Sequence, residues 1–199
     1  MVRTEVKRRS VGLALFRTQP DPTVEALYGA IVAQARLPGF YASYGVPDTV
    51  EGRFDMIILH LSLVLRRLRS TPADSGNLGQ ALFDRFCSDM ENNFREMGVS
   101  DLGVPKEMRR VGEAFYGRAA AYDRALDRGD MGALVEALSR NVFAGNATDG
   151  AEQLRDYVQQ TERELANQPV ASIAKGNLQF PETNESAPLA CRTGKEEKP

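Results

Sequence analysis

The only histidine of the chain, His60, is the first residue that could do chemistry, and it lies in the stretch EGRFDMIILHLSLVLRRL, residues 51–68. A catalytic imidazole needs a nucleophile or an orienting carboxylate nearby, and a haem ligand needs a second ligand. Residues three and four positions away on a helix lie beside His60, and these are Met56, Ile57, Leu63 and Val64. We therefore interpret His60 as a packed, hydrogen-bonded histidine. A haem-binding or haem-dependent helical enzyme that uses His60 is the alternative.

Arg53 and Asp55 are charged residues at the start of the same stretch, just before it becomes almost wholly apolar. Residues two positions apart on a helix point in different directions, so these two cannot pair with each other. Each therefore needs another partner or solvent. We expect structural pairing with a neighbouring helix, and contact with a partner protein is the alternative.

A second group of charged and aromatic residues lies in DLGVPKEMRRVGEAFYGRAAAYDRAL, residues 101–126, which contains Lys106. Its Arg118 and Tyr122 are four positions apart, a spacing that suits a guanidinium stacked on a ring. The chain has no Ser-His-Asp set and no G-x-x-x-x-G-K-[ST] loop. Its two cysteines, Cys87 and Cys191, form no CxxC or Cys/His cluster. These patterns predict no enzyme, no cofactor, no metal site and no small-molecule substrate.

Helices must position these residues, because apolar residues recur at helical spacing between polar caps and no convincing period-2 alternation occurs. Helices are predicted at about residues 22–37, 49–70, 77–97, 105–128, 131–144 and 150–167. Asp48 is the expected N-cap of the second helix, because Glu51 follows three positions later. The predicted fold class is therefore all-α, a single helical bundle-like domain of about six helices.

The net charge of -2 hides an uneven distribution along the chain. Residues 1–19 form a basic arm with five basic residues and one acidic residue, and the predicted helical domain, residues 20–166, is acidic. Residues 167–199 are polar, charge-balanced and interrupted by prolines, which predicts a disordered tail. An acidic domain is a poor binder of DNA, whereas the basic arm suits contact with ribosomal RNA or anionic lipid.

The longest apolar run, MIILHLSLVL, has about half of the ~20 residues that a membrane span needs. The N-terminal segment has neither the apolar core of a secretory signal nor the composition of a mitochondrial transit peptide. We expect a bacterial cytoplasmic protein, with peripheral contact at the inner face of the cytoplasmic membrane.

Three segments together resemble the ubiquinol-cytochrome c chaperone family: LYGAIVAQAR, FYASYGVPDTVEGRFDMIILHLSLVLRRL and DMENNFREMGVSDLGVPKEMRRVGEAFYGRAAAYDRAL. The resemblance covers about residues 20–145. It implies a non-catalytic assembly chaperone that binds newly made cytochrome b and promotes assembly of the cytochrome bc1 complex, respiratory complex III. Mitochondrial members imply further partners, the ribosome and a small helical co-chaperone. A general helical interaction scaffold is the remaining alternative.

A client made of transmembrane helices needs apolar surface to bind, and aromatic residues are favoured at interfaces. The loop after the first predicted helix supplies three aromatic residues, which we expect to form an exposed rim. Together with the family's matching positions, the candidate client- or partner-binding residues are Phe40, Tyr41, Tyr44, Arg53, Asp55, Asp101, Lys106, Tyr116, Arg118 and Tyr122.

Overall fold

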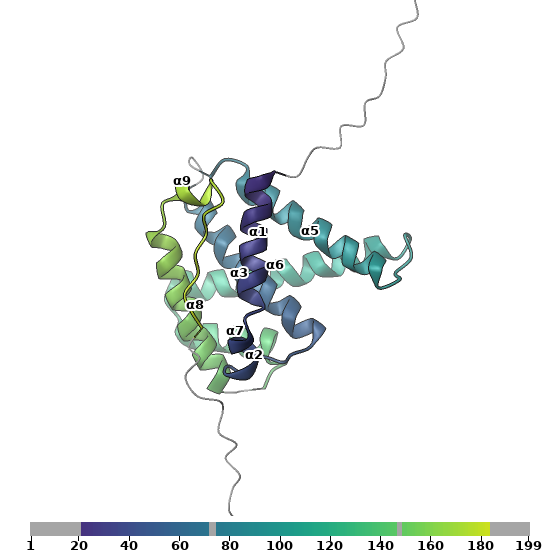
Figure 1. The fold of residues 1–199 in the computed structure, drawn as a ribbon. Helices are drawn as coiled ribbons and strands as arrows, with labels where there is room; N and C mark the ends of the chain where they lie inside the picture. Colours follow the sequence, from purple (N-terminus) through teal and green to yellow (C-terminus); the bar gives the residue numbers. More distant parts are fainter. Residues whose placement is uncertain (1–20, 72–74, 147–148, 184–199) are drawn as a thin grey trace, which may run out of the picture.

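The computed structural model describes residues 21–71, 75–146 and 149–183, and the basic arm lies outside these ranges (Figure 1). Six long helices match the six that the sequence predicts. They are α1 (Pro22–Ala35), α3 (Val50–Arg69), α5 (Leu78–Glu96), α6 (Val104–Arg128), α7 (Met131–Val142) and α8 (Asp149–Asn167). Two short helices are also present: α2 (Pro38–Ala42) lies between α1 and α3, and α9 (Val170–Ile173) follows α8. The described residues contain no strand, so the all-α prediction is confirmed.

Side chains cap the starts of several helices. Asp21 accepts a hydrogen bond from an N–H group in the first turn of α1 at 2.8 Å. The Thr49 hydroxyl accepts one from the Gly52 N–H of α3 at 3.1 Å. The prediction that Asp48 caps α3 is therefore wrong by one residue. Thr49 has the extended backbone that an N-cap needs, whereas the Asp48 carboxylate pairs with Arg53.

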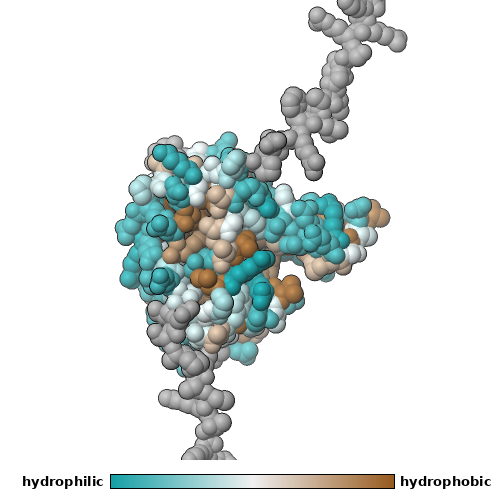
Figure 2. Space-filling view, viewed as in Figure 1, coloured by the Kyte–Doolittle hydropathy of each residue, from teal (hydrophilic) through white to brown (hydrophobic). Residues whose placement is uncertain are grey.

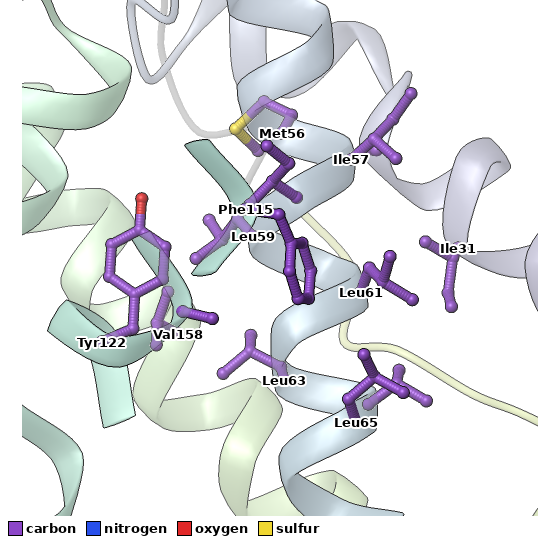
Figure 3. Close-up of a cluster of buried hydrophobic side chains, with 14 of the residues drawn as sticks. Ile31, Met56, Ile57, Leu59, Leu61, Leu63, Leu65, Phe115, Tyr122 and Val158 are labelled. Carbon is purple, nitrogen blue, oxygen red and sulfur yellow. The ribbon is translucent and has the colours of Figure 1, made fainter. Parts of the chain in front are cut away.

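Helix α3 is the centre of the fold and packs against α1, α5, α6, α7 and α8. Figure 3 shows side chains from α1, α6 and α8 gathered around it. From Asp55 to Leu65 every residue of α3 is buried, which explains why its apolar residues occupy all sides of the helix. Complete burial of one such side chain stabilises the fold by about 1.5–3 kcal/mol.

Helices α5 and α6 form an antiparallel hairpin whose far end projects from the body of the domain (Figure 1). The turn between them includes Gly98, whose φ of 84° lies in the left-handed region that glycine adopts without strain. The base of the hairpin packs on α3 through Phe86 and Phe115. The projecting end is therefore held mainly by contacts between the two helices.

The ordered domain extends beyond residue 166, where the sequence predicted a disordered tail to begin. Helix α9 buries Val170 and Ile173 in the core. The following segment, residues 174–183, which we call the C-terminal strap, packs its two large apolar side chains on the same core. The prediction is thus wrong for residues 167–183, because apolar residues spaced among polar ones anchor the segment. Residues 184–199 lie outside the described ranges.

Candidate functional site

The aromatic residues expected to form an exposed rim are mostly buried. Phe40 is fully buried and Tyr44 is almost so, whereas Tyr41 is partly exposed. The Phe40 ring meets the Tyr157 ring edge-on, with centroids 4.8 Å apart, and lies 5.4 Å from the His60 ring. The prediction of an aromatic rim is therefore wrong for Phe40 and Tyr44. Short helix α2 and the turn that follows it place these two rings inside, where burial stabilises them.

His60 is a buried structural residue whose two ring nitrogens both have hydrogen-bond partners. The Met56 carbonyl, 2.7 Å from Nδ1, can only accept, so Nδ1 carries the proton. Nε2 then accepts from the Tyr157 hydroxyl at 2.8 Å. Burial lowers the pKa of His60 to about 4, which keeps the ring neutral. Neither nitrogen is free to bind haem iron in this arrangement, so the packed interpretation is favoured over the haem alternative.

Arg53 belongs to a small exposed surface at the start of α3, which we call the α2–α3 corner: Tyr41, Asp48, Val50 and Arg53. The Arg53 Nε lies 2.7 Å from the Asp48 carboxylate, and its guanidinium stands 5.5 Å from the centre of the Tyr41 ring. The Tyr41 hydroxyl donates to the Ala35 carbonyl at 2.7 Å. Val50 has 72% of its surface exposed. The corner is thus an exposed surface with one apolar side chain, one partly exposed aromatic ring and one ion pair.

Asp55 and Arg118 form a buried tie between α3 and α6, with a nitrogen–oxygen distance of 2.8 Å. Burial raises the pKa of Asp55 to about 6, although the Arg118 guanidinium opposes this rise. Arg118 thus makes an ion pair where its spacing predicted stacking on Tyr122, and the Tyr122 side chain is buried. This confirms the expectation that Asp55 pairs with a neighbouring helix. Asp55 and Tyr122 are thus buried and can only support a surface, whereas Arg118 keeps 23% of its side chain exposed.

The projecting end of the α5–α6 hairpin carries two exposed apolar residues, Met97 and Leu102, that were not among the predicted site residues. We call this end the hairpin surface: Met97, Asp101, Leu102 and Lys106. Tyr116 is also exposed but lies nearer the base of the hairpin. Leu102 is 95% exposed, and Met97 and Tyr116 are each 62% exposed. The Tyr116 ring is held by Phe83, 5.6 Å away between centroids, and by Phe115 at 5.4 Å. In the sequence, the presence of apolar residues within the turn MGVSDLG could have indicated that Met97 and Leu102 are exposed.

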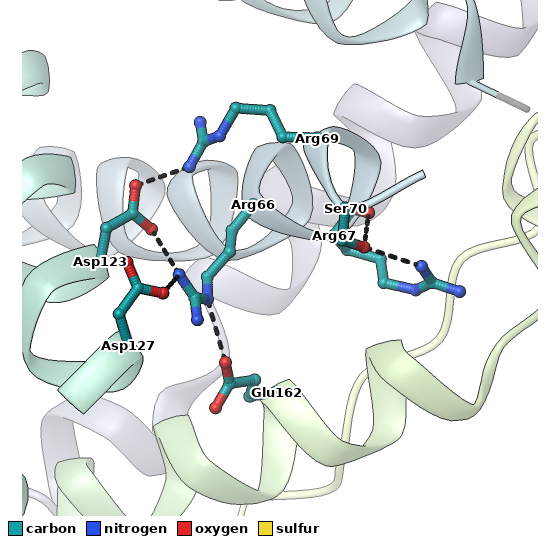
Figure 4. A network of polar contacts seen from close by, with 7 residues as sticks. All are labelled: Arg66, Arg67, Arg69, Ser70, Asp123, Asp127 and Glu162. Atoms are coloured by element: carbon teal, nitrogen blue, oxygen red, sulfur yellow. Dashed lines mark hydrogen bonds and ion pairs between the residues drawn. The ribbon is translucent and has the colours of Figure 1, made fainter. Parts of the chain in front are cut away.

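The arginines at the end of α3 tie three helices together (Figure 4). Arg66 contacts Asp127 of α6 at 2.6 Å and Glu162 of α8 at 2.9 Å. Arg69 contacts Asp123 of α6 at 2.6 Å. Arg67, the third arginine, donates to the Leu165 carbonyl at 2.7 Å and to the Gln168 carbonyl at 2.9 Å. Three arginines thus stand near three carboxylates, so the cluster has no excess positive charge for an anionic ligand. Its role is to orient α6 and α8 on the core.

The described residues contain no group of three or more His, Cys, Asp or Glu side chains placed to hold a metal ion. The described part of the molecule instead has two exposed surfaces on a helical body: the apolar end of the hairpin and the α2–α3 corner. The family model of the ubiquinol-cytochrome C chaperones matches residues 42–180 of the chain. The chain belongs to this family.

Members of the ubiquinol-cytochrome C chaperone family in other organisms are similar to this chain. Ubiquinol-cytochrome c reductase complex assembly factor 1 of Mus musculus is 26% identical over 134 residues, covering 66% of this chain and 45% of that protein. Protein CBP3, mitochondrial, of Saccharomyces cerevisiae is 32% identical over 109 residues, covering 53% of this chain and 32% of that protein. The chain spans between 32% and 59% of the length of the curated relatives it matches.

A solved structure of the family has the same fold. The crystal structure of the Cbp3 homolog from Brucella abortus superposes with a TM-score of 0.74 and 37% sequence identity. The match covers 81% of this chain and 90% of that one. Among the residues described for this chaperone-family chain, no helix is both long enough and apolar enough to cross a membrane.

Proposed function

We propose that this protein is a non-catalytic assembly chaperone that binds newly made cytochrome b and promotes assembly of the cytochrome bc1 complex. The observation that carries the proposal is the family match over residues 42–180. Three of the relatives are named as assembly factors of the ubiquinol-cytochrome c reductase complex, which is this same complex. The exposed apolar side chains and the engaged nitrogens of His60 fit binding better than catalysis.

The hairpin surface is the best candidate for contact with the client. Four large apolar residues stand out as exposed among the described ones, and two of them, Met97 and Leu102, lie on this surface, whereas Tyr116 lies nearer the base of the same hairpin. Exposed apolar residues gathered on one projecting element indicate an interaction site, and aromatic residues are enriched in interface cores. Asp101 and Lys106 beside them supply charges of both signs for the polar rim of such an interface. The α2–α3 corner is the second candidate surface.

The client is a membrane protein, so the chaperone must work where cytochrome b enters the bilayer. We place it at the inner face of the cytoplasmic membrane, in peripheral contact. The basic arm, with Arg3, Lys7, Arg8, Arg9 and Arg17, suits anionic lipid, at roughly 1 kcal/mol for each basic residue near the surface. A ribosome and a small helical co-chaperone are further partners within this proposal.

The test is a pull-down of the tagged full chain in mild detergent from its own cells, followed by mass spectrometry. We expect cytochrome b or another bc1 component as the dominant partner. A set of soluble proteins without any bc1 component would refute the proposal and favour a general scaffold. In cells that lack the protein, cytochrome b should fall while unrelated membrane proteins stay constant.

Two matched variants separate the candidate surfaces. Leu102→Asp places a charge on the hairpin surface, and Val50→Asp does the same at the α2–α3 corner, where the side chain is similarly exposed. Since both positions are exposed, neither change should reduce stability much. We expect Leu102→Asp to reduce recovery of cytochrome b several-fold more than Val50→Asp. The reverse order would move the client to the corner.

A further inference from the structure

The C-terminal strap crosses the face of the domain between α1 and α8 (Figure 1). Near its start, at Gly176, a Cβ would lie 3.2 Å from the Cβ of Ala26 in the first half of α1. It ends at Thr183, whose hydroxyl lies only 2.6 Å from where a Cβ on Gly39 of α2 would stand. The strap therefore follows the whole length of α1 in the same direction. Beyond Asn177 it has no regular secondary structure.

Side-chain amides of the two helices hold the backbone of the strap. Gln168, just after α8, donates to the Gln179 carbonyl at 2.8 Å and accepts from the Gln179 N–H at 3.0 Å. Gln34 of α1 donates to the Pro181 carbonyl at 2.9 Å. Both glutamine side chains bind main-chain atoms, which every peptide has. They would therefore hold an extended peptide of a different sequence equally well.

The strap inserts one aromatic side chain toward the core. The Phe180 ring meets the His60 ring edge-on, with centroids 5.4 Å apart. Gln34, which holds the strap's backbone, also donates to the Tyr157 hydroxyl at 3.0 Å, so the strap adjoins the buried His60–Tyr157 network. Phe180 itself is only partly buried. The strap thus fills a groove between α1 and α8. In this groove Gln34 and Gln168 bind main-chain atoms, and one aromatic ring lies beside His60.

The walls of this groove do not depend on the strap. Both α1 and α8 pack on α3, and each buries its own apolar face there through residues such as Ile31 and Val158. In contrast, residues 178–183 make no backbone–backbone hydrogen bond among the described residues. Figure 2 shows pale and brown atoms mixed with hydrophilic ones on the face where α1 and the strap lie. The segment is therefore held by side-chain contacts and not by a backbone ladder, which is typical of segments that open locally before the rest of a domain.

We propose that the groove between α1 and α8 is a binding site for an extended peptide with an aromatic side chain, and that the C-terminal strap is its occupant within the chain. Displacement of the strap admits such a segment from another protein. That the incoming segment comes from the client rests on the proposed chaperone function, whereas the groove's capacity for peptide does not. Because the strap is tethered, its effective concentration is on the order of millimolar, so only a competing segment that binds well displaces it.

The test uses the full chain and a fluorescent synthetic peptide with the sequence of residues 174–184, measured by anisotropy. Phe180→Ala empties the aromatic position of the tethered strap. We expect this variant to bind the peptide at least about tenfold more tightly than the wild-type chain, which is occupied by its own strap. A peptide with alanine in place of its phenylalanine should bind neither chain. Equal binding of the peptide to variant and wild type would overturn the proposal.

Phe94→Ala is the matched control, because Phe94 is also a partly buried phenylalanine but lies on α5, away from the groove. It should bind the peptide as weakly as the wild type does, and tight binding by this variant would show general loosening instead. Hydrogen exchange in the wild-type chain needs no variant. The amides of residues 178–180, 182 and 183 should exchange at least about tenfold faster than those of α1 and α8. Equal protection of all three segments would overturn a displaceable strap.

The source of the incoming segment is tested separately, with the cytochrome b pull-down. Excess peptide should reduce recovery of cytochrome b, and Phe180→Ala should increase it. If the peptide binds Phe180→Ala but does not compete with cytochrome b, the assignment of a client segment to the groove is overturned. The proposed function is judged by the wild-type pull-down alone, so the two outcomes are distinguishable.

Discussion

Two buried groups, His60 and Asp55, should give this protein opposite responses to acid over the same pH range. The pKa of His60 falls from 6.5 to about 4 on folding, because burial penalises its charged form. The pKa of Asp55 rises from 3.8 to about 6, chiefly for the same reason, despite its pairing with Arg118. As pH falls, the unfolded chain protonates first at His60, whereas the folded chain protonates first at Asp55.

Linkage sets the size and the sign of each effect. His60 contributes stability that is complete above pH 6.5 and is lost toward pH 4, a loss of about 3 kcal/mol from its pKa shift. Asp55 acts in the other direction. Its contribution is complete below pH 3.8 and is lost as pH rises through about 6, again about 3 kcal/mol. The two nearly cancel, so the free energy of unfolding of the wild type should change little between pH 6.5 and 5.

The assay is urea unfolding, monitored by circular dichroism, at several pH values in this range. Asp55→Asn leaves the histidine effect alone, so its stability should fall by about 1 kcal/mol for each unit of acidification. His60→Gln leaves the Asp55 effect, so its stability should rise by a similar amount. Both variants lose hydrogen bonds and start from lower stability, but the slope against pH is independent of that starting level. Three parallel profiles would refute the reasoning, as would a steep wild-type profile.

Two further predictions concern packing. Leu61→Ala, at a fully buried position of α3, should lower the free energy of unfolding by about 2–5 kcal/mol in urea titrations, and a loss well under 1 kcal/mol would contradict its place in the core. Gly150→Ala should destabilise the fold by more than about 1 kcal/mol, because a Cβ there would overlap the Tyr44 carbonyl. Its control, Gly117→Ala on the open side of α6, should instead raise the melting temperature through about 1 kcal/mol of helix propensity.

The sequence predicted the helices well because helix starts and stops are local. Asp130 accepts from the Ala133 N–H at 3.0 Å, and Gly129 ends α6 with a φ of 62°. A helix cap depends on residues within one turn of it, so the local residue types are enough to predict it. Even the one-residue error at Asp48 concerned neighbouring residues of similar capping ability. The all-round apolar pattern of α3 likewise predicted its burial directly.

The candidate site was harder to predict because it depends on which way side chains turn. Phe40, Tyr44 and Tyr122 are aromatic residues that would suit an interface, but packing against α8 or α7 places them inside. Leu102 was not predicted as a site residue because a single leucine in a turn is common in proteins. Only the projecting hairpin makes its exposure meaningful, since no other element covers it.

The sequence by itself determined the all-α class, the six long helices and the structural character of His60, because these follow from local periodicity and from the apolar neighbours of the histidine. The tertiary structure decided the partners that act across the chain: Arg118 for Asp55, Tyr157 for His60, and the helices α1 and α8 for the strap. These pairs are separated by tens of residues, and no local pattern specifies which distant side chain completes a buried ion pair or hydrogen bond. The fold brings them together, and burial then makes their interactions strong.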